Sequence, residues 1–230
     1  MSEGTDERAR SGAPDGTSPS GASSNLGVSI LRVAWLAILL GLAMEGLLLL
    51  LSTGLGELLG LGTIVADLVR NVSWSVFVCV GLALGTTIAK ARVHAMGLLG
   101  LFSGPLAFEV SRVFHKGTLE ALGASGGGGG DDLSPFLIAL IKGLEYGCLG
   151  LAVGWVGSRP WGGLIAHVAV GLVVGVIFGG TIVALTLGST PTLSAAAVLS
   201  QSVNEILFPV GCSVVLFSAR VLGERIKNRS

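Results

Sequence analysis

Charged residues are scarce in this chain. Only 12% of its 230 residues are Asp, Glu, Lys or Arg, whereas 51% are hydrophobic, so there are too few charges to cover the surface of a soluble domain. None of these four residue types occurs between Arg159 and Glu205, a gap long enough to cross a bilayer twice at about 20 residues per crossing. The composition excludes an ordinary soluble protein and predicts an integral membrane protein.

Motifs for common cofactors and ligands are also missing. The three cysteines and three histidines are widely separated, which favours neither a disulfide framework nor a metal site. Glycine is abundant, but no loop ends in the Gly-Lys-Ser/Thr of a phosphate-binding loop. The net charge is zero, which argues against a nucleic-acid partner. We therefore expect no cofactor and no metal, and a protein that is not an enzyme is favoured over one that is.

Turn residues and charges divide the apolar sequence into six segments. Each has about the length that a membrane-spanning helix needs, so the sequence predicts an all-α, polytopic fold with six transmembrane helices. The segments are Ile30 to Ser52, Ile64 to Ala89, His94 to Phe114, Pro135 to Val156, Trp161 to Leu187 and Ala195 to Ala219.

Three kinds of region flank and divide this membrane domain. Residues 1–27 are rich in Ser, Gly and Pro and predict a disordered tail, residues 28–221 form the six-helix domain, and residues 222–230 form a basic tail. The 115–133 stretch contains five consecutive glycines and predicts a flexible loop. Most Lys and Arg residues fall on the side of the two termini, so we expect both termini in the cytoplasm and the protein in the cell (inner) membrane.

Glycines form stripes along the fourth and fifth predicted helices. Their spacing of three, four or eight residues places them on one helix side, where backbones can approach closely. We expect these two helices to pack tightly, against each other or against a homo-oligomeric copy or a partner membrane protein. The stripes include Gly143, Gly147, Gly150 and Gly154, and Gly171, Gly175 and Gly179.

Ionisable residues occur within the predicted crossings, where an unpartnered charge is costly. Three acid–base pairs are spaced three residues apart, which puts each pair on one helix face: Asp67 with Arg70, Glu109 with Arg112, and Glu145 with Lys142. Glu45 and Glu205 have no such neighbour, and Asn204 adds a neutral ligand beside Glu205. These two glutamates must find partners on other helices, be protonated, or bind a cation.

Most of these groups lie in the middle-to-outer half of the predicted bundle. We therefore expect them to line one polar cavity open to the outer face. The alternative is a buried network of salt bridges and hydrogen bonds that only fixes helix register.

Similar spacings suggest that the two halves of the chain are diverged copies. Glu145 lies 100 positions after Glu45, and Glu205 lies 96 positions after Glu109. Three crossings per copy would place the halves in opposite orientations, as in the inverted 3+3 repeats of transporters.

Two function classes follow from these features. The first is a proton- or cation-coupled transporter or channel in which Glu45 and Glu205 titrate or bind a cation. The second is a non-catalytic membrane scaffold or assembly subunit that packs through its glycine stripes. A third class, an intramembrane enzyme acting on lipid, lacks a recognisable reaction centre.

Overall fold

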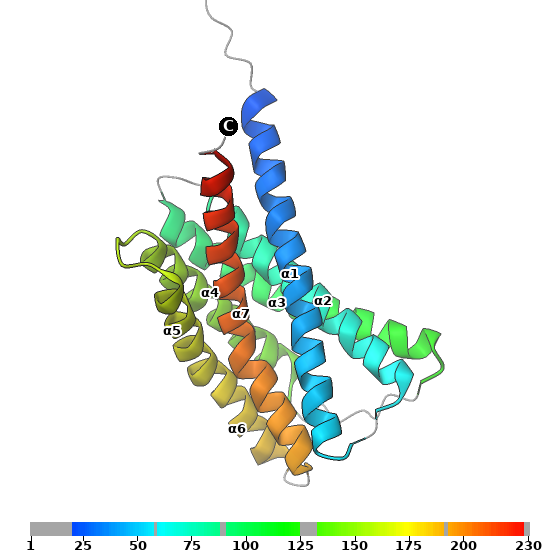
Figure 1. Cartoon of the computed structure of the whole chain (residues 1–230). Coiled ribbons are helices and arrows are strands. Elements are labelled where there is room, and N and C mark those ends of the chain that lie inside the picture. Colours follow the sequence, from blue (N-terminus) through cyan, green and yellow to red (C-terminus); the bar gives the residue numbers. More distant parts are fainter. Residues whose placement is uncertain (1–19, 58, 88–90, 125–132, 191–192, 228–230) are drawn as a thin grey trace, which may run out of the picture.

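The computed structural model describes residues 20–57, 59–87, 91–124, 133–190 and 193–227, and all regular structure in these ranges is helical (Figure 1). The elements are α1 (Ser20–Gly54), α2 (Leu61–Gly85), α3 (Arg92–Ala121), α4 (Pro135–Gly157), α5 (Leu164–Val174), a π-helical turn η2 (Gly175–Gly179), α6 (Gly180–Ser189) and α7 (Ala195–Lys227). Helices α5, η2 and α6 follow one another without a break and form one rod.

Three helices extend beyond the segment boundaries predicted from the sequence. Helix α1 begins at Ser20, within the stretch assigned to the first tail, and α3 continues to Ala121, within the stretch assigned to the loop. Helix α7 likewise continues to Lys227. The rest of both tails, at 1–19 and 228–230, and the five consecutive glycines at 126–130 lie outside the described residues.

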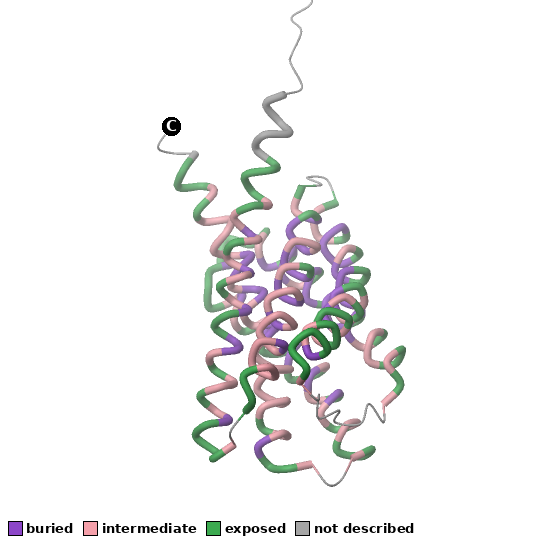
Figure 2. Tube along the Cα trace, turned by 90° about the vertical axis from the view of Figure 1, so that its right-hand side faces the viewer, coloured by how far each residue is buried: buried purple, intermediate pink, exposed green. Residues whose placement is uncertain are grey.

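Six spans of the described chain are long and apolar enough to cross a membrane, which confirms the predicted all-α polytopic fold. Many large apolar residues are exposed, and Figure 2 shows exposed positions along the outside of the bundle. Phe136 is 77% exposed and Ile165 is 86% exposed. An apolar surface of this extent is unfavourable in water but is solvated by lipid tails. The chain is therefore a multipass integral membrane protein in contact with a lipid bilayer.

The helices pack in a consecutive order around the bundle. Helix α1 contacts α2 and α7, α2 contacts α3, and α3 contacts α4, while the α5–η2–α6 rod packs mainly on α7. The first residue of α1 and the last of α7 lie at the same end of the bundle (Figure 1).

Glycines bring the backbones of α3 and α4 into close contact. A Cβ atom added at Gly104 would lie 2.5 Å from the carbonyl oxygen of Lys142, and one added at Gly150 would overlap the carbonyl oxygen of Met96. The α4 glycines that face α3 in this way are Gly143, Gly147, Gly150 and Gly154. Within the chain, helix α4 therefore packs chiefly on α3, whereas the glycine stripes led us to expect the fifth crossing or a copy in another subunit as its partner.

The second glycine stripe faces α7. A Cβ added at Gly171 would lie 2.6 Å from the Cα of Val210, and one at Gly175 would overlap the carbonyl oxygen of Ile206. Gly179 continues the stripe toward the carbonyl of Glu205. Both stripes are thus occupied by helices of the same chain.

Two prolines lie inside helices, Pro105 in α3 and Pro209 in α7. Each lacks the N–H that would bond the carbonyl four residues earlier, so the carbonyls of Leu101 and Glu205 lose their intrahelical partners. A glycine of a neighbouring helix approaches each of these carbonyls, since a Cβ at Gly143 or Gly179 would lie 3.0 or 2.8 Å from them, respectively. The proposed duplication of the two halves stays a prediction.

The interior contains two of the three cysteines. Cys79 of α2 and Cys212 of α7 are fully buried in the same core cluster, close enough for their thiols to interact, and no disulfide joins them. Cys148 is exposed on α4. The sequence separation of Cys79 and Cys212 gave no sign of this contact, which arises because α2 and α7 pack together.

Candidate functional site

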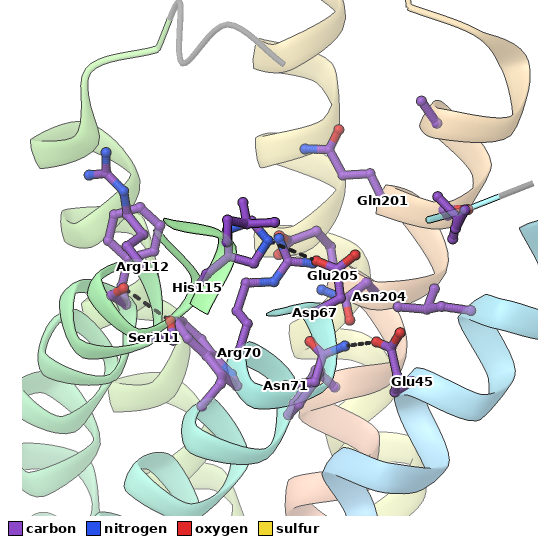
Figure 3. Close-up of a pocket in the computed structure, with 18 of the residues that line it drawn as sticks. Glu45, Asp67, Arg70, Asn71, Ser111, Arg112, His115, Gln201, Asn204 and Glu205 are labelled. Atoms are coloured by element: carbon purple, nitrogen blue, oxygen red, sulfur yellow. Dashed lines mark hydrogen bonds and ion pairs between the residues drawn. The ribbon is translucent and has the colours of Figure 1, made fainter. Parts of the chain in front are cut away.

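A polar cavity of about 830 Å³ lies between α1, α2, α3, α4, α6 and α7 (Figure 3). Its volume falls within the range of small-molecule binding sites. The lining includes Glu57 and Leu59 from the α1–α2 connection, Ala124 after α3, and Ala197 near the start of α7. The cavity therefore opens at the end of the bundle opposite to Ser20 and Lys227.

Lys142 lies at the deep end of this cavity, between two carboxylates. Its Nζ lies 2.9 Å from Oε2 of Glu145, one turn away on α4, and also donates to Oε2 of Glu205 on α7. The Lys142 side chain is only 6% exposed and that of Glu145 is fully buried. The second Glu145 oxygen, Oε1, is buried and has no hydrogen-bond partner among the described residues. With all three groups ionised, this triad carries a net charge of minus one.

Glu45 forms a second acidic position on the opposite wall. It is 4% exposed, and its Oε2 accepts a hydrogen bond of 2.8 Å from Nδ2 of Asn71 on α2. No ion pair to Glu45 is present in the described part of the chain. Asn204 and Gln201 of α7 line the same cavity, and the Oδ1 of Asn204 is buried without a described hydrogen-bond partner. The described residues around Glu45 therefore offer carboxylate and amide oxygens, and the nearby Arg70 acts on Glu45 through its charge without forming an ion pair with it.

A third charged cluster links α2 and α3 along the cavity. Asp67 Oδ1 lies 3.1 Å from Nη2 of Arg70 and 3.2 Å from Nε2 of His115 (Figure 3). The sequence identified the Asp67–Arg70 pair but missed His115. The available signal was helical spacing, because His115 follows Ser111, another cavity residue, by four positions.

Glu109 and Arg112 differ in where their side chains point. Their closest atoms are 3.9 Å apart, which makes them a weak pair. Arg112 lines the cavity, whereas the Glu109 side chain is 55% exposed and does not. Of the seven predicted polar site residues, the structure places five on the cavity wall: Glu45, Arg112, Lys142, Asn204 and Glu205. Glu145 lies behind Lys142.

Aromatic side chains close the deep end of the cavity. The Trp74 ring makes edge contacts with Phe108, Tyr146 and Phe208, at centroid distances of 6.5, 5.7 and 6.4 Å. Its Nε1 donates to the hydroxyl of Tyr146 at 3.2 Å, and the Lys142 ammonium lies 5.3 Å from its centroid. We call Trp74, Phe108, Tyr146 and Phe208 the aromatic floor. The sequence did not single out these residues, because an aromatic residue in an apolar helix is ordinarily core.

Helix irregularities adjoin the triad. Glu205 provides both the side chain that binds Lys142 and the backbone carbonyl left free by Pro209. That carbonyl faces Gly179 of the π-helical turn. Such turns occur frequently at functional sites because they interrupt the regular hydrogen-bond ladder.

No family model, curated protein or solved structure matches the chain. No group of three or more His, Cys, Asp or Glu among the described residues is arranged to hold a metal ion. Function is therefore inferred from the geometry of the cavity.

Proposed function

We propose that this protein is a proton- or cation-coupled transporter that moves a proton, a cation or a small charged solute through the polar cavity. The main support for this proposal is the position of the unbalanced negative charge. The triad of Glu145, Lys142 and Glu205 has one acid in excess, and Glu45 accepts a hydrogen bond from the neutral Asn71 but forms no ion pair with a described residue. Both excess charges lie on a cavity that is accessible from one end.

Charge neutralisation gives these positions a mechanism. A carboxylate in a low-dielectric surrounding favours protonation or a bound cation, because the uncompensated charge is poorly solvated. Loading Glu45 and the triad with protons or cations removes the excess charge. The loaded carboxylates then cost less to expose toward the apolar inner half, and this links occupancy to conformation.

The aromatic floor favours alternating access over an open channel. Trp74 and its partners separate the cavity from the buried apolar core that contains Val78, Leu82 and Leu149. A transported ion or solute can pass only if the rings of the aromatic floor move apart. The helices beside the floor contain two irregularities, Pro209 in α7 and the π-helical turn in the fifth crossing. These are the kinds of helix break at which membrane helices bend.

The distribution of basic residues orients the transporter. Cytoplasmic ends of membrane helices are enriched in Lys and Arg. The end that contains the start of α1 and the end of α7 carries Arg32, Arg92, Arg159, Arg220 and Arg225. We infer that this end is cytoplasmic, that both termini are inside, and that the cavity faces outward from the cell membrane.

The scaffold alternative receives less support. It requires glycine stripes that dock against partner helices, but the stripes of α4 and α5 face α3 and α7 of the same chain. If the scaffold reading holds, Gly150→Leu should dissociate a complex, whereas neutral substitutions in the cavity should be mild.

The decisive experiment measures proton and cation flux across liposomes containing the purified full-length protein. We expect flux in the wild type and its loss in the Glu45→Gln/Glu205→Gln variant at matched incorporation. Glu109→Gln is the control, because it makes the same type of substitution at a glutamate outside the cavity. Undiminished flux in the double variant, or no flux in the wild type under any gradient, would contradict the proposal.

A further inference from the structure

A second, much smaller pocket lies at the opposite end of the bundle. It measures about 20 Å³, enough for one water-sized group, and is lined by ends of α2, α3, α4, α5 and α7. Its polar lining consists of Thr86, Arg92, His167 and Arg220, and no carboxylate among the described residues lines it. The pocket is therefore basic.

Arg220 is held at this pocket by backbone carbonyls. Its Nη1 donates to the carbonyl of Gly157 at 2.7 Å and its Nη2 to that of Gly162 at 3.3 Å. Among the described residues, Glu224 is the acid that faces this side chain: its Oε1 lies 4.0 Å from the Arg220 Nε, too far for a hydrogen bond, and its side chain is 68% exposed, so it neutralises only part of the charge. The Nε of Arg220 is buried and lacks a hydrogen-bond partner among the described residues.

Arg92 brings a second guanidinium to the same place. It is the first residue of α3, and the cap residue Ala91 offers no side-chain hydrogen bond to the free N–H groups of the first turn. The Nε of Arg92 is also buried and has no described partner. The charge of Arg220 acts unfavourably on Arg92, and the Glu224 carboxylate offsets part of this effect. Two like charges with unpaired donors beside an uncapped helix N-terminus are suited to bind an anion.

The surroundings of the pocket indicate the membrane interface. Trp155 and Trp161 stack edge to face at 5.5 Å, and the guanidinium of Arg159 lies 4.9 Å from the Trp155 ring. Tryptophans of this kind are enriched at the level of lipid headgroups. Basic pockets between helices at the cytoplasmic side are typical binding places for anionic headgroups.

We propose that Arg92 and Arg220 form a binding site for a phosphate group, supplied by an anionic phospholipid of the inner leaflet. Guanidinium groups match phosphate oxygens in shape and charge. The pocket admits one phosphate oxygen, so the rest of the headgroup lies at its mouth. The occupied site ties the ends of α3 and α7 together through the lipid and is separate from the transport cavity.

Native mass spectrometry of the full-length protein in detergent tests this site. The additions are phosphatidylglycerol, diacylglycerol as a lipid without phosphate, and inorganic phosphate. We expect retained phosphatidylglycerol and no retained diacylglycerol. Inorganic phosphate that competes with the lipid supports the phosphate chemistry, and inorganic phosphate bound in preference to the lipid assigns the source to solution.

Arg92→Gln is the informative variant, because no described hydrogen bond of the fold depends on this side chain. We expect it to weaken phosphatidylglycerol binding by about tenfold, as the loss of one charge-assisted hydrogen bond implies. Arg225→Gln, which removes an exposed arginine from the same end of α7, should leave binding unchanged. Equal binding by the wild type and Arg92→Gln, or an equal loss in Arg225→Gln, would overturn the proposal. Because binding is read directly, this result does not depend on transport.

Discussion

Lys142 of α4 and Glu205 of α7 are 63 positions apart in the sequence, and their side chains form a direct ion pair inside the bundle. The same ammonium also binds Glu145 on its own helix. Lys142 therefore compensates two carboxylates at once and joins the two halves of the chain at the cavity.

Replacing Lys142 with Met should destabilise the protein strongly. Removing one partner of a buried ionic cluster leaves the remaining charges uncompensated, which costs about 3–5 kcal/mol. The Lys142→Met/Glu145→Gln variant should recover part of this loss, because it also removes a fully buried carboxylate. Thermal unfolding in detergent measures both, with the exposed Lys116→Met as the control. A Lys142→Met variant as stable as the wild type would show that the triad is not charged.

Gly150→Ala should weaken the contact between α3 and α4. The new methyl group would overlap the carbonyl oxygen of Met96, and overpacking of this kind costs about 1–3 kcal/mol. Gly46→Ala in α1 is the matched control, because a Cβ there meets no atom within 4 Å. We expect lower thermal stability for the first variant only. Equal effects of the two substitutions would mean that helix propensity, and not close packing, determines the outcome.

The sequence predicted the number of crossings well because the bilayer imposes a physical length on each apolar segment. It predicted the local pair of Lys142 and Glu145 because three-residue spacing is geometric. Helix partners were harder to predict. The glycine stripe of α4 defines a face of that helix, but nothing in its period says that α3, and not α5, covers it.

The composition of the cavity wall was only partly predictable for a related reason. Charges in apolar helices stand out, so Glu45 and Glu205 were identified as candidates. Trp74 does not stand out, although it lies at the centre of the aromatic floor. Glu109 stands out equally, but its side chain points away from the cavity, because sequence spacing fixes neighbours on one helix and not the direction of the bundle axis.

Cysteine accessibility should reveal the orientation of the cavity. In a variant whose three cysteines are replaced by alanine, Gln201→Cys places a thiol on the cavity wall and Arg225→Cys places one on the exposed opposite end. A membrane-impermeant maleimide added to intact cells should label the first and not the second. Permeabilised cells should allow labelling of both. The reverse pattern in intact cells would place the cavity mouth in the cytoplasm.

Trp74→Ala should open the aromatic floor. The substitution removes edge contacts with three rings and the hydrogen bond to Tyr146, and truncating a buried Trp costs about 3–5 kcal/mol. We expect a proton leak in liposomes that the wild type lacks, together with lower thermal stability. Trp74→Phe keeps a ring in place and should preserve the seal. A tight Trp74→Ala variant would locate the barrier elsewhere.

The π-helical turn at Gly175–Gly179 changes the rotation of α6 about the helix axis relative to α5. Four residues exceed one α-helical turn of 3.6, so a stripe with four-residue steps drifts around the helix, and a wider turn absorbs the excess. This change of rotation keeps Gly171, Gly175 and Gly179 on the side of the rod that contacts α7. Deleting one residue of the turn would rotate α6 by about 100° relative to α5, since each residue advances an α-helix by that angle. Thr186, which accepts a hydrogen bond of 3.1 Å from Gln201 at the cavity wall, would then turn away from α7.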